Sequence, residues 1–142
     1  MAGLVVVDDS VVLARHRAGE STYHLLPGGG VAWGESLEEA LVREIAEETG
    51  LVCTVGRPIV VNDTIAPDGS RHVVNITFTC TRVGGSIVTE PEDPRVEAVD
   101  LIAADDLPKI DLRPPIAEYL VAAVRQPDVA TIYAGSLYRA GP

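Results

Sequence analysis

Three glutamates, Glu44, Glu47 and Glu48, are spaced so that a helix would carry their carboxylates on one side. Residues three or four apart return to the same helix face, and these three occupy an arc of roughly 100°. Like charges at this spacing destabilise an isolated helix by roughly a few tenths of a kcal/mol per pair. A hard divalent cation such as Mg²⁺, which prefers oxygen ligands, would offset this repulsion. The alternative is an ordinary solvated helix face.

A glycine-rich loop, Gly28 to Gly30 after Pro27, precedes the three glutamates. Glycines allow the backbone to approach a ligand closely, so that bare N–H and C=O groups can meet a metal ion or a phosphate. The N-terminal end of the following helix carries a partial positive charge that favours anions. The loop and the carboxylates together indicate metal-assisted attack at phosphorus.

Local signals predict the helix that must position these glutamates. Ser36 and Glu39 have the spacing of a capping box, in which each residue bonds the backbone N–H of the other, so a helix should begin at about Leu37. Gly50 supplies a left-handed stop. The arc beside the glutamates is suited to face a core, and it consists of Leu41, Val42, Ile45 and Thr49.

The other apolar patterns predict mainly strands. Strands are expected at residues 4–7 and 11–14, joined by an acidic turn, and at 51–61, 71–83 and 96–103. An amphipathic helix is expected at residues 116–125, after two prolines. In the tail, one more strand is expected at residues 131–138. Two alternatives are open for it: pairing with another subunit, or capping the sheet of its own chain.

The composition favours a single globular domain and excludes several classes of protein. The chain has 142 residues, 46% of them hydrophobic, and a net charge of −10, which disfavours binding to nucleic acid or to an anionic membrane. Cys53 and Cys80 stand in no metal-binding spacing and are expected to be buried free thiols. We find no signal peptide or membrane-spanning segment, so the expected location is the cytoplasm.

One continuous pattern links the loop and the helix: Gly29-x5-Glu35-x7-Arg43-Glu44-Ile45-Ala46-Glu47-Glu48-Thr49-Gly50-Leu51. It has every specified position of the Nudix box, so the chain resembles the Nudix hydrolases. A random start would match on the order of 10⁻⁸ of the time at ordinary residue frequencies. The resemblance implies an α/β fold, a single-domain α/β/α sandwich with a mixed β-sheet over residues 1–126. Residues 127–142 would be a tail, and an extra strand of the same domain is one reading of it.

The resemblance also implies a role for each residue of the box. In this family the box binds Mg²⁺ or Mn²⁺ and cuts a pyrophosphate linkage. Glu47 and Glu48 would be the central metal ligands, and Glu44 a further ligand or the base that activates water. The carbonyl of Gly28 would complete the metal shell. The remaining roles are those of supporting residues: Arg43 would orient the glutamates, while Glu35 and Gly29 would support the site.

Many members of this family use one more acid from a later loop, and Glu97 and Glu92 are the candidates here. Glu97 directly precedes the strand-like residues 98–102, where the family commonly places such an acid. The alternative is an exposed charge at the end of a strand.

The substrate implied by the resemblance is a nucleoside diphosphate joined to another group, with ADP-ribose or another NDP-sugar favoured. Pro67 lies sixteen residues beyond Leu51, a spacing associated with ADP-ribose pyrophosphatases. A nucleoside triphosphate pyrophosphohydrolase that releases pyrophosphate and a nucleotide sensor that cuts nothing remain alternatives. A homodimer is also open. The side chains considered for substrate contact are Tyr23, Trp33, Phe78 and Arg71.

Overall fold

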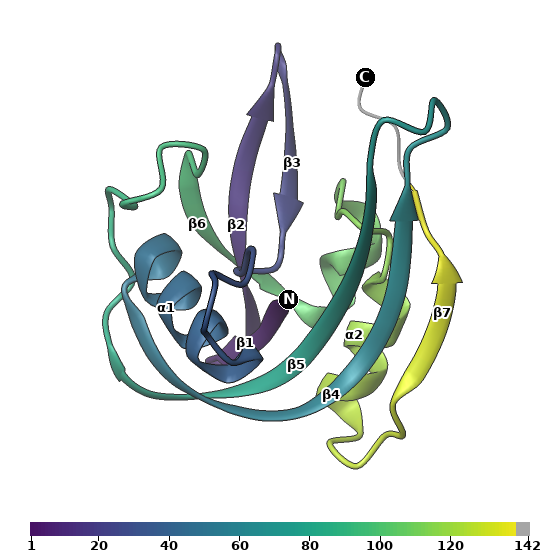
Figure 1. Ribbon diagram of the computed structural model, residues 1–142. Helices are drawn as coiled ribbons and strands as arrows, with labels where there is room; N and C mark the ends of the chain where they lie inside the picture. The colour runs from purple at the N-terminus through teal and green to yellow at the C-terminus, as the bar shows by residue number, and fades with distance from the viewer. Residues whose placement is uncertain (139–142) are drawn as a thin grey trace.

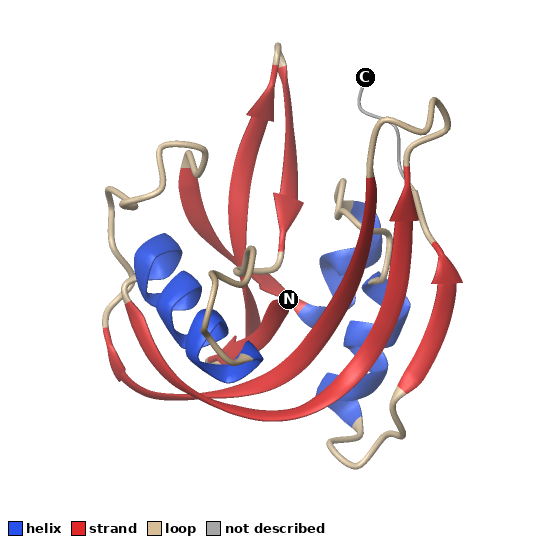
Figure 2. Cartoon of the chain, in the orientation of Figure 1, coloured by secondary structure: helices blue, strands red, loops and turns tan. Residues whose placement is uncertain are grey.

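The computed structural model describes residues 1–138, which form a mixed β-sheet with helices on both faces (Figures 1 and 2). The strands are β1 (Ala2–Val7), β2 (Ser10–Ala18), β3 (Ser21–Leu25), β4 (Leu51–Ile65), β5 (His72–Gly85), β6 (Ala98–Ala103) and β7 (Ile132–Ser136). The helices are α1 (Leu37–Thr49), the 3₁₀ helix η1 (Ala104–Lys109) and α2 (Ala117–Arg125). The strand order is β3-β2-β1-β5-β4-β7, and β6 also pairs with β2. The β1–β5 and β4–β7 pairs are parallel and the other pairs are antiparallel.

The two α-helices cover opposite faces of the sheet because successive side chains of a strand point in opposite directions. Val5 of β1 lies in a buried cluster with Leu41 and Ile45 of α1. The neighbouring Leu4 lies in a second buried cluster with Leu120 of α2. The predicted α/β/α sandwich with a mixed sheet is therefore confirmed.

The first hairpin has the acidic turn that the sequence predicts. Val7 pairs with Ser10, so Asp8 and Asp9 form a two-residue turn in which both have positive φ, 48° and 62°. Asp tolerates this left-handed backbone better than most residues, and the twist of such turns suits a hairpin.

The observed elements differ from the predicted ones where pairing, rather than local sequence, stabilises a strand. The polar strand β3 was not predicted, and it forms through five register pairs with β2. Strand β4 continues to Ile65, four residues beyond its predicted end at residue 61, because its pairing with β5 extends as far as His72. Strand β6 begins at Ala98, two residues later than predicted.

The tail adds a strand to its own sheet. Strand β7 runs parallel to β4, with Ile132 beside Val60 and Tyr133 beside Val61. It forms the edge of the sheet in Figure 1. The last residues of the predicted tail, 139–142, lie outside the described residues.

The described residues also test the predictions about the two cysteines and about membrane-spanning segments. Cys53 and Cys80 are buried and form no disulfide. No helix within residues 1–138 combines the length and the apolar character needed to cross a bilayer.

The packing of α2 gives a direct test of the sandwich. Leu120 is fully buried, so Leu120→Ala should lower the free energy of unfolding by about 2–5 kcal/mol, through lost burial and the cavity left behind. Leu101→Ala, at a β6 position that is 44% exposed, is the matched control and should change it by about 0.5 kcal/mol or less. Urea denaturation measures both, and equal losses would contradict the placement of α2.

Candidate active site

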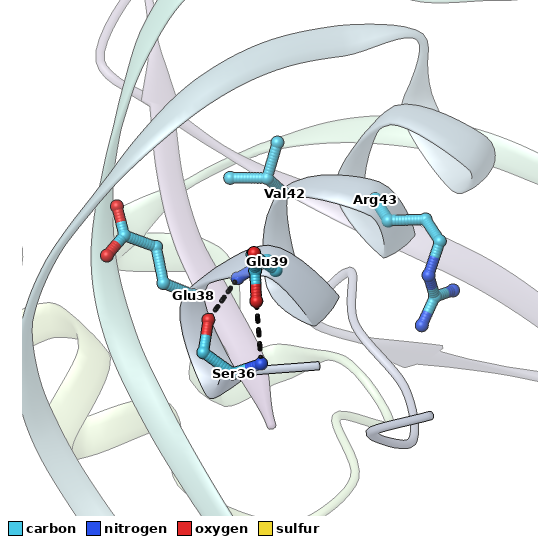
Figure 3. A pocket seen from close by; sticks show the side chains of 5 residues that line it. All are labelled: Ser36, Glu38, Glu39, Val42 and Arg43. Carbon is cyan, nitrogen blue, oxygen red and sulfur yellow. Dashed lines mark hydrogen bonds between the residues drawn. The ribbon is translucent and has the colours of Figure 1, made fainter. Parts of the chain in front are cut away.

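Capping interactions at both ends fix helix α1, which carries the three glutamates. The Glu39 N–H donates to the Ser36 hydroxyl at 3.2 Å, and the Ser36 N–H donates to the Glu39 carboxylate at 2.8 Å (Figure 3). At the other end, Gly50 has a φ of 75° and its N–H donates to the Ala46 carbonyl. The predicted start at Leu37 and the predicted glycine stop are both confirmed.

The glycine loop is held against β1 by backbone contacts. The Gly3 N–H donates to the Pro27 carbonyl at 2.9 Å, the Met1 nitrogen donates to the Gly29 carbonyl at 2.9 Å, and Ala2 forms a bridge with Gly28. A Cβ on Gly28 would lie 2.3 Å from the Met1 carbonyl oxygen, and the Gly28 φ is 152°. Only glycine fits this approach without strain.

Two of the three glutamates lie directly against this loop. The Gly28 N–H donates to Glu48 Oε2 at 2.9 Å. The Gly29 backbone lies on the Glu44 carboxylate, because a Cβ built on Gly29 would be 2.4 Å from its carboxyl carbon. Both side chains are buried, Glu48 with only 3% of its surface exposed. The loop and the helix therefore enclose two carboxylates.

One guanidinium, that of Arg43, holds the acids of the box in place. Arg43 donates to both carboxylate oxygens of Glu35, at 2.7 and 2.9 Å, and to Glu44 Oε1 at 2.9 Å. Two longer hydrogen bonds of 3.4 Å reach Glu47 Oε2 and the Gly30 carbonyl. These contacts raise the pKa of Arg43, and the hydrogen bonds with Glu35 contribute most. In turn, the hydrogen bonds from Arg43 lower the pKa of Glu35 to about 2.

Glu48 lacks comparable compensation for its charge. Burial raises its pKa to about 7, and the nearby charges of Glu44 and Asp93 act in the same direction. The hydrogen bond from Gly28 and the charge of Arg95 oppose this shift without cancelling it. A cation beside Glu48 would therefore stabilise its charged form.

Glu47 occupies a different position. Its side chain is 40% exposed, and its carboxylate lies toward Arg43. Within residues 1–138, no three His, Cys, Asp or Glu side chains converge closely enough to form a complete metal-binding group. The available donors are nevertheless carboxylate and carbonyl oxygens. Two of the carboxylates are buried, and the positive charge near Glu48 does not cancel the rise in its pKa. This donor chemistry fits a hard divalent cation such as Mg²⁺ or Mn²⁺.

The two candidate acids from the later loop, residues 86–97 between β5 and β6, make contacts of different kinds. The Glu97 carboxylate accepts a hydrogen bond from Arg17 Nε at 3.0 Å and lies 3.6 Å from Arg15 Nε. Glu92 meets the box through its backbone, because its N–H donates to the Glu47 carbonyl at 3.0 Å, while the residue itself is exposed.

Two residues of this loop that the sequence did not single out, Asp93 and Arg95, are electrostatically closer to the box. The charges of both act on Glu48. Arg95 is paired with Asp93 through its guanidinium and its backbone N–H. A usable signal was present in the sequence: Asp93 stands between Pro91 and Pro94, which restrict the backbone of the loop.

Two of the aromatic candidates for substrate contact are engaged elsewhere in the protein. The Tyr23 ring stacks on His16, with centroids 5.3 Å apart, and the Arg113 guanidinium lies 4.2 Å from the Tyr23 centroid. Phe78 packs against the buried cluster beneath α1. Neither ring stands free as a platform for a base.

Arg71 and Trp33 are both exposed but differ in position. Arg71 directly precedes β5, in the turn that joins β4 to β5. Trp33 is fully exposed on the loop between Gly30 and α1. This loop is tied down by Glu35, which accepts the Ala32 N–H at 2.8 Å and pairs with Arg43. Of the four candidates, Trp33 is the exposed aromatic side chain, and it lies within the box itself, between Gly29 and Glu35.

An open depression of about 700 Å³ lies on the outer side of the first turns of α1 (Figure 3). Its lining residues are Ser36, Glu38, Glu39, Val42 and Arg43. Of these residues, Arg43 holds a specified position of the box, and none of the three glutamates at 44, 47 and 48 lines the depression. The chemistry is therefore expected at the glycine loop and not in this depression.

The close contact between Gly29 and Glu44 gives a test of the site. Gly29→Ala places a methyl group where the Glu44 carboxylate now lies, so that carboxylate must move, and affinity for Mg²⁺ should fall by about tenfold or more. Isothermal titration calorimetry measures the affinity.

Gly30→Ala is the matched control, because a Cβ at Gly30 meets no atom within 4 Å. Its affinity for Mg²⁺ should equal that of the wild type. Equal affinities for both variants would show that the loop does not shape the metal site.

Comparisons with known proteins agree with this geometry. The sequence profile of the NUDIX domain matches residues 1–123. An ADP-ribose pyrophosphatase from Methanocaldococcus jannaschii is 34% identical over 109 residues, 76% of this chain and 63% of that protein. An NAD-capped RNA hydrolase NudC from Stutzerimonas stutzeri is 33% identical over 122 residues, 85% of this chain and 42% of that protein. The chain thus spans less than two thirds of the length of either relative.

Solved structures show the same fold. A NUDIX hydrolase from Nitrosomonas europaea matches with a TM-score of 0.75 at 18% identity, over 92% of this chain and 90% of that one. At this identity the likeness concerns the fold alone. Together with the profile match and the complete box, it shows that the chain belongs to the Nudix hydrolase family.

Proposed function

We propose that this protein is a divalent-metal-dependent pyrophosphohydrolase that cleaves a nucleoside diphosphate linked to another group. ADP-ribose or another NDP-sugar is the favoured substrate class. The observation that carries the proposal is the burial of Glu44 and Glu48 against the backbone of Gly28 and Gly29. The name of the 34% identical relative, an ADP-ribose pyrophosphatase, supports the substrate class.

In this proposal the metal would be held by Glu47, Glu48 and the Gly28 carbonyl. When bound, a divalent cation neutralises phosphate oxygens and lowers the pKa of water. Glu48 must be deprotonated to act as a ligand, and its pKa of about 7 places that change near neutral pH.

The remaining box residues orient this centre. Glu44, fixed by the 2.9 Å hydrogen bond from Arg43, is the base that takes a proton from the attacking water or a further ligand. Glu35 holds Arg43 through two hydrogen bonds, so the guanidinium has a single orientation. Among the acids outside the box, Asp93 is better placed than Glu97 to influence the reaction, because its charge acts on Glu48.

Product analysis tests the reaction class. The protein is incubated with Mg²⁺ and a panel of ADP-ribose, other NDP-sugars, nucleoside triphosphates, dinucleoside polyphosphates and NAD-capped RNA, and the products are separated by chromatography. We expect AMP and ribose 5-phosphate from ADP-ribose, and no turnover with EDTA.

Other products would redirect or reject the proposal. Pyrophosphate released from a triphosphate would favour the nucleotide-cleaning alternative. Cleavage of NAD-capped RNA in preference to free nucleotides would contradict the small-molecule assignment. If nothing is cut but a nucleotide raises the melting temperature, the sensor alternative replaces the enzyme.

Glu48→Gln should lower kcat by about 10² or more on the best substrate of the panel. The substitution removes the negative charge of a proposed metal ligand, and the metal is what neutralises the phosphate oxygens. The glutamine can still accept the hydrogen bond from Gly28, so the melting temperature should not fall. Glu90→Gln, in the exposed part of the later loop, is the control and should keep wild-type turnover. Near wild-type kcat for Glu48→Gln would remove Glu48 from the mechanism.

A further inference from the structure

Arg95 is a cation beside the box that the proposed mechanism does not use. Its loop is docked on α1 through the hydrogen bond from the Glu92 N–H to the Glu47 carbonyl, at 3.0 Å. The loop is closed by a second hydrogen bond of 3.0 Å, from the Val96 N–H to the Asp93 carbonyl, and Val96 is buried. These contacts place Arg95 near the C-terminal half of α1, where the glutamates lie.

Arg95 and Arg43 differ in how many protein groups their guanidinium groups bond to. Arg43 bonds to three carboxylates and one carbonyl, so it can meet a substrate only by releasing the box. The Arg95 guanidinium bonds to one carboxylate, that of Asp93, with Nη2 2.5 Å from Oδ2, and its side chain is 75% exposed.

The surroundings of Arg95 fix its backbone but leave its guanidinium facing solvent. Asp93 lies beneath it with a largely buried side chain. His16, only 7% exposed, lies beside the Arg95 backbone. The hydrogen bonds with Asp93 raise the pKa of Arg95, and the charges of Glu48 and Glu44 raise it further. The cation therefore lies within the field of both buried glutamates.

We infer that Arg95 binds the pyrophosphate group of the substrate, exchanging its ion pair with Asp93 for hydrogen bonds to phosphate oxygens. This inference rests on the proposed function. A pyrophosphate approaching this site meets several carboxylates on a chain with a net charge of −10, so binding needs a local cation besides the metal. The forked guanidinium matches phosphate geometry. Asp93 keeps the side chain in position until the substrate arrives.

Calorimetric titration with inorganic pyrophosphate in the presence of Mg²⁺ tests Arg95 without depending on turnover. Arg95→Gln keeps most of the side-chain stem and should weaken binding by about tenfold to a hundredfold, the typical effect of losing a hydrogen bond between charged groups. Arg125→Gln is the matched control. Arg125 is 64% exposed and pairs with one aspartate, Asp105, but it lies on α2, so pyrophosphate affinity should not change.

Asp93→Asn separates substrate binding from a purely structural ion pair. If the pair only braces the loop, Asp93→Asn and Arg95→Gln should weaken pyrophosphate binding alike, and that result would overturn the inference. If Arg95 leaves Asp93 to bind phosphate, Asp93→Asn removes the competing carboxylate and should bind pyrophosphate at least as tightly as the wild type. Equal affinity of wild type and Arg95→Gln, or no binding to the wild type, would also overturn it.

Kinetics on the best substrate distinguish this inference from the proposed function. Arg95→Gln should lower kcat/KM at least tenfold, mainly by raising KM, because the contact is already made in the bound substrate. Wild-type turnover with an unchanged KM in Arg95→Gln overturns the inference and leaves the function intact. Arg95-dependent binding of pyrophosphate by a protein that cuts nothing in the panel overturns the function and supports the inference.

Discussion

The burial of two carboxylates on successive turns of one helix is the constraint on which the site depends. Glu44 and Glu48 have the same charge and are both removed from water, an arrangement that is costly unless positive charge or hydrogen bonds compensate it. Arg43 compensates Glu44, whereas Glu48 receives one backbone N–H and keeps a raised pKa. A divalent cation is the compensation that we propose for Glu48, and the same cation would draw a pyrophosphate to the site.

The fold supplies the backbone that makes this burial possible. Capping interactions fix both ends of α1, and β1 holds the glycine loop against the carboxylates through Gly3 and its neighbours. The absence of a side chain at Gly28 and Gly29 allows contacts that a Cβ would block. The later loop then docks on the carbonyl of Glu47, which brings Asp93 and its partner Arg95 to the same end of the helix.

Features encoded by residues close together in the chain could be predicted from the sequence. The capping box, the glycine stop and the spacing of the glutamates predicted α1 and its acidic side. Apolar patterns predicted several of the strands, whereas the sandwich followed from the resemblance to the Nudix hydrolases. The pairing of Glu97 with Arg17 could not be predicted, because the two residues lie 80 positions apart in the sequence. The same holds for Tyr23, whose ring is covered by Arg113. Strand β3 has little apolar pattern of its own and forms through its pairing with β2.

Proton release on metal binding tests the central claim, that a divalent cation compensates Glu48, most directly. Because burial raises the pKa of Glu48 to about 7, the carboxyl is mostly protonated at pH 6 and must lose its proton to bind metal. Calorimetric titration with Mg²⁺ in buffers of different ionisation enthalpy should therefore show release of about one proton per ion near pH 6 and almost none near pH 8.5, with affinity rising between them. Mg²⁺ binding with no proton release at either pH, or no binding at all, would contradict the account.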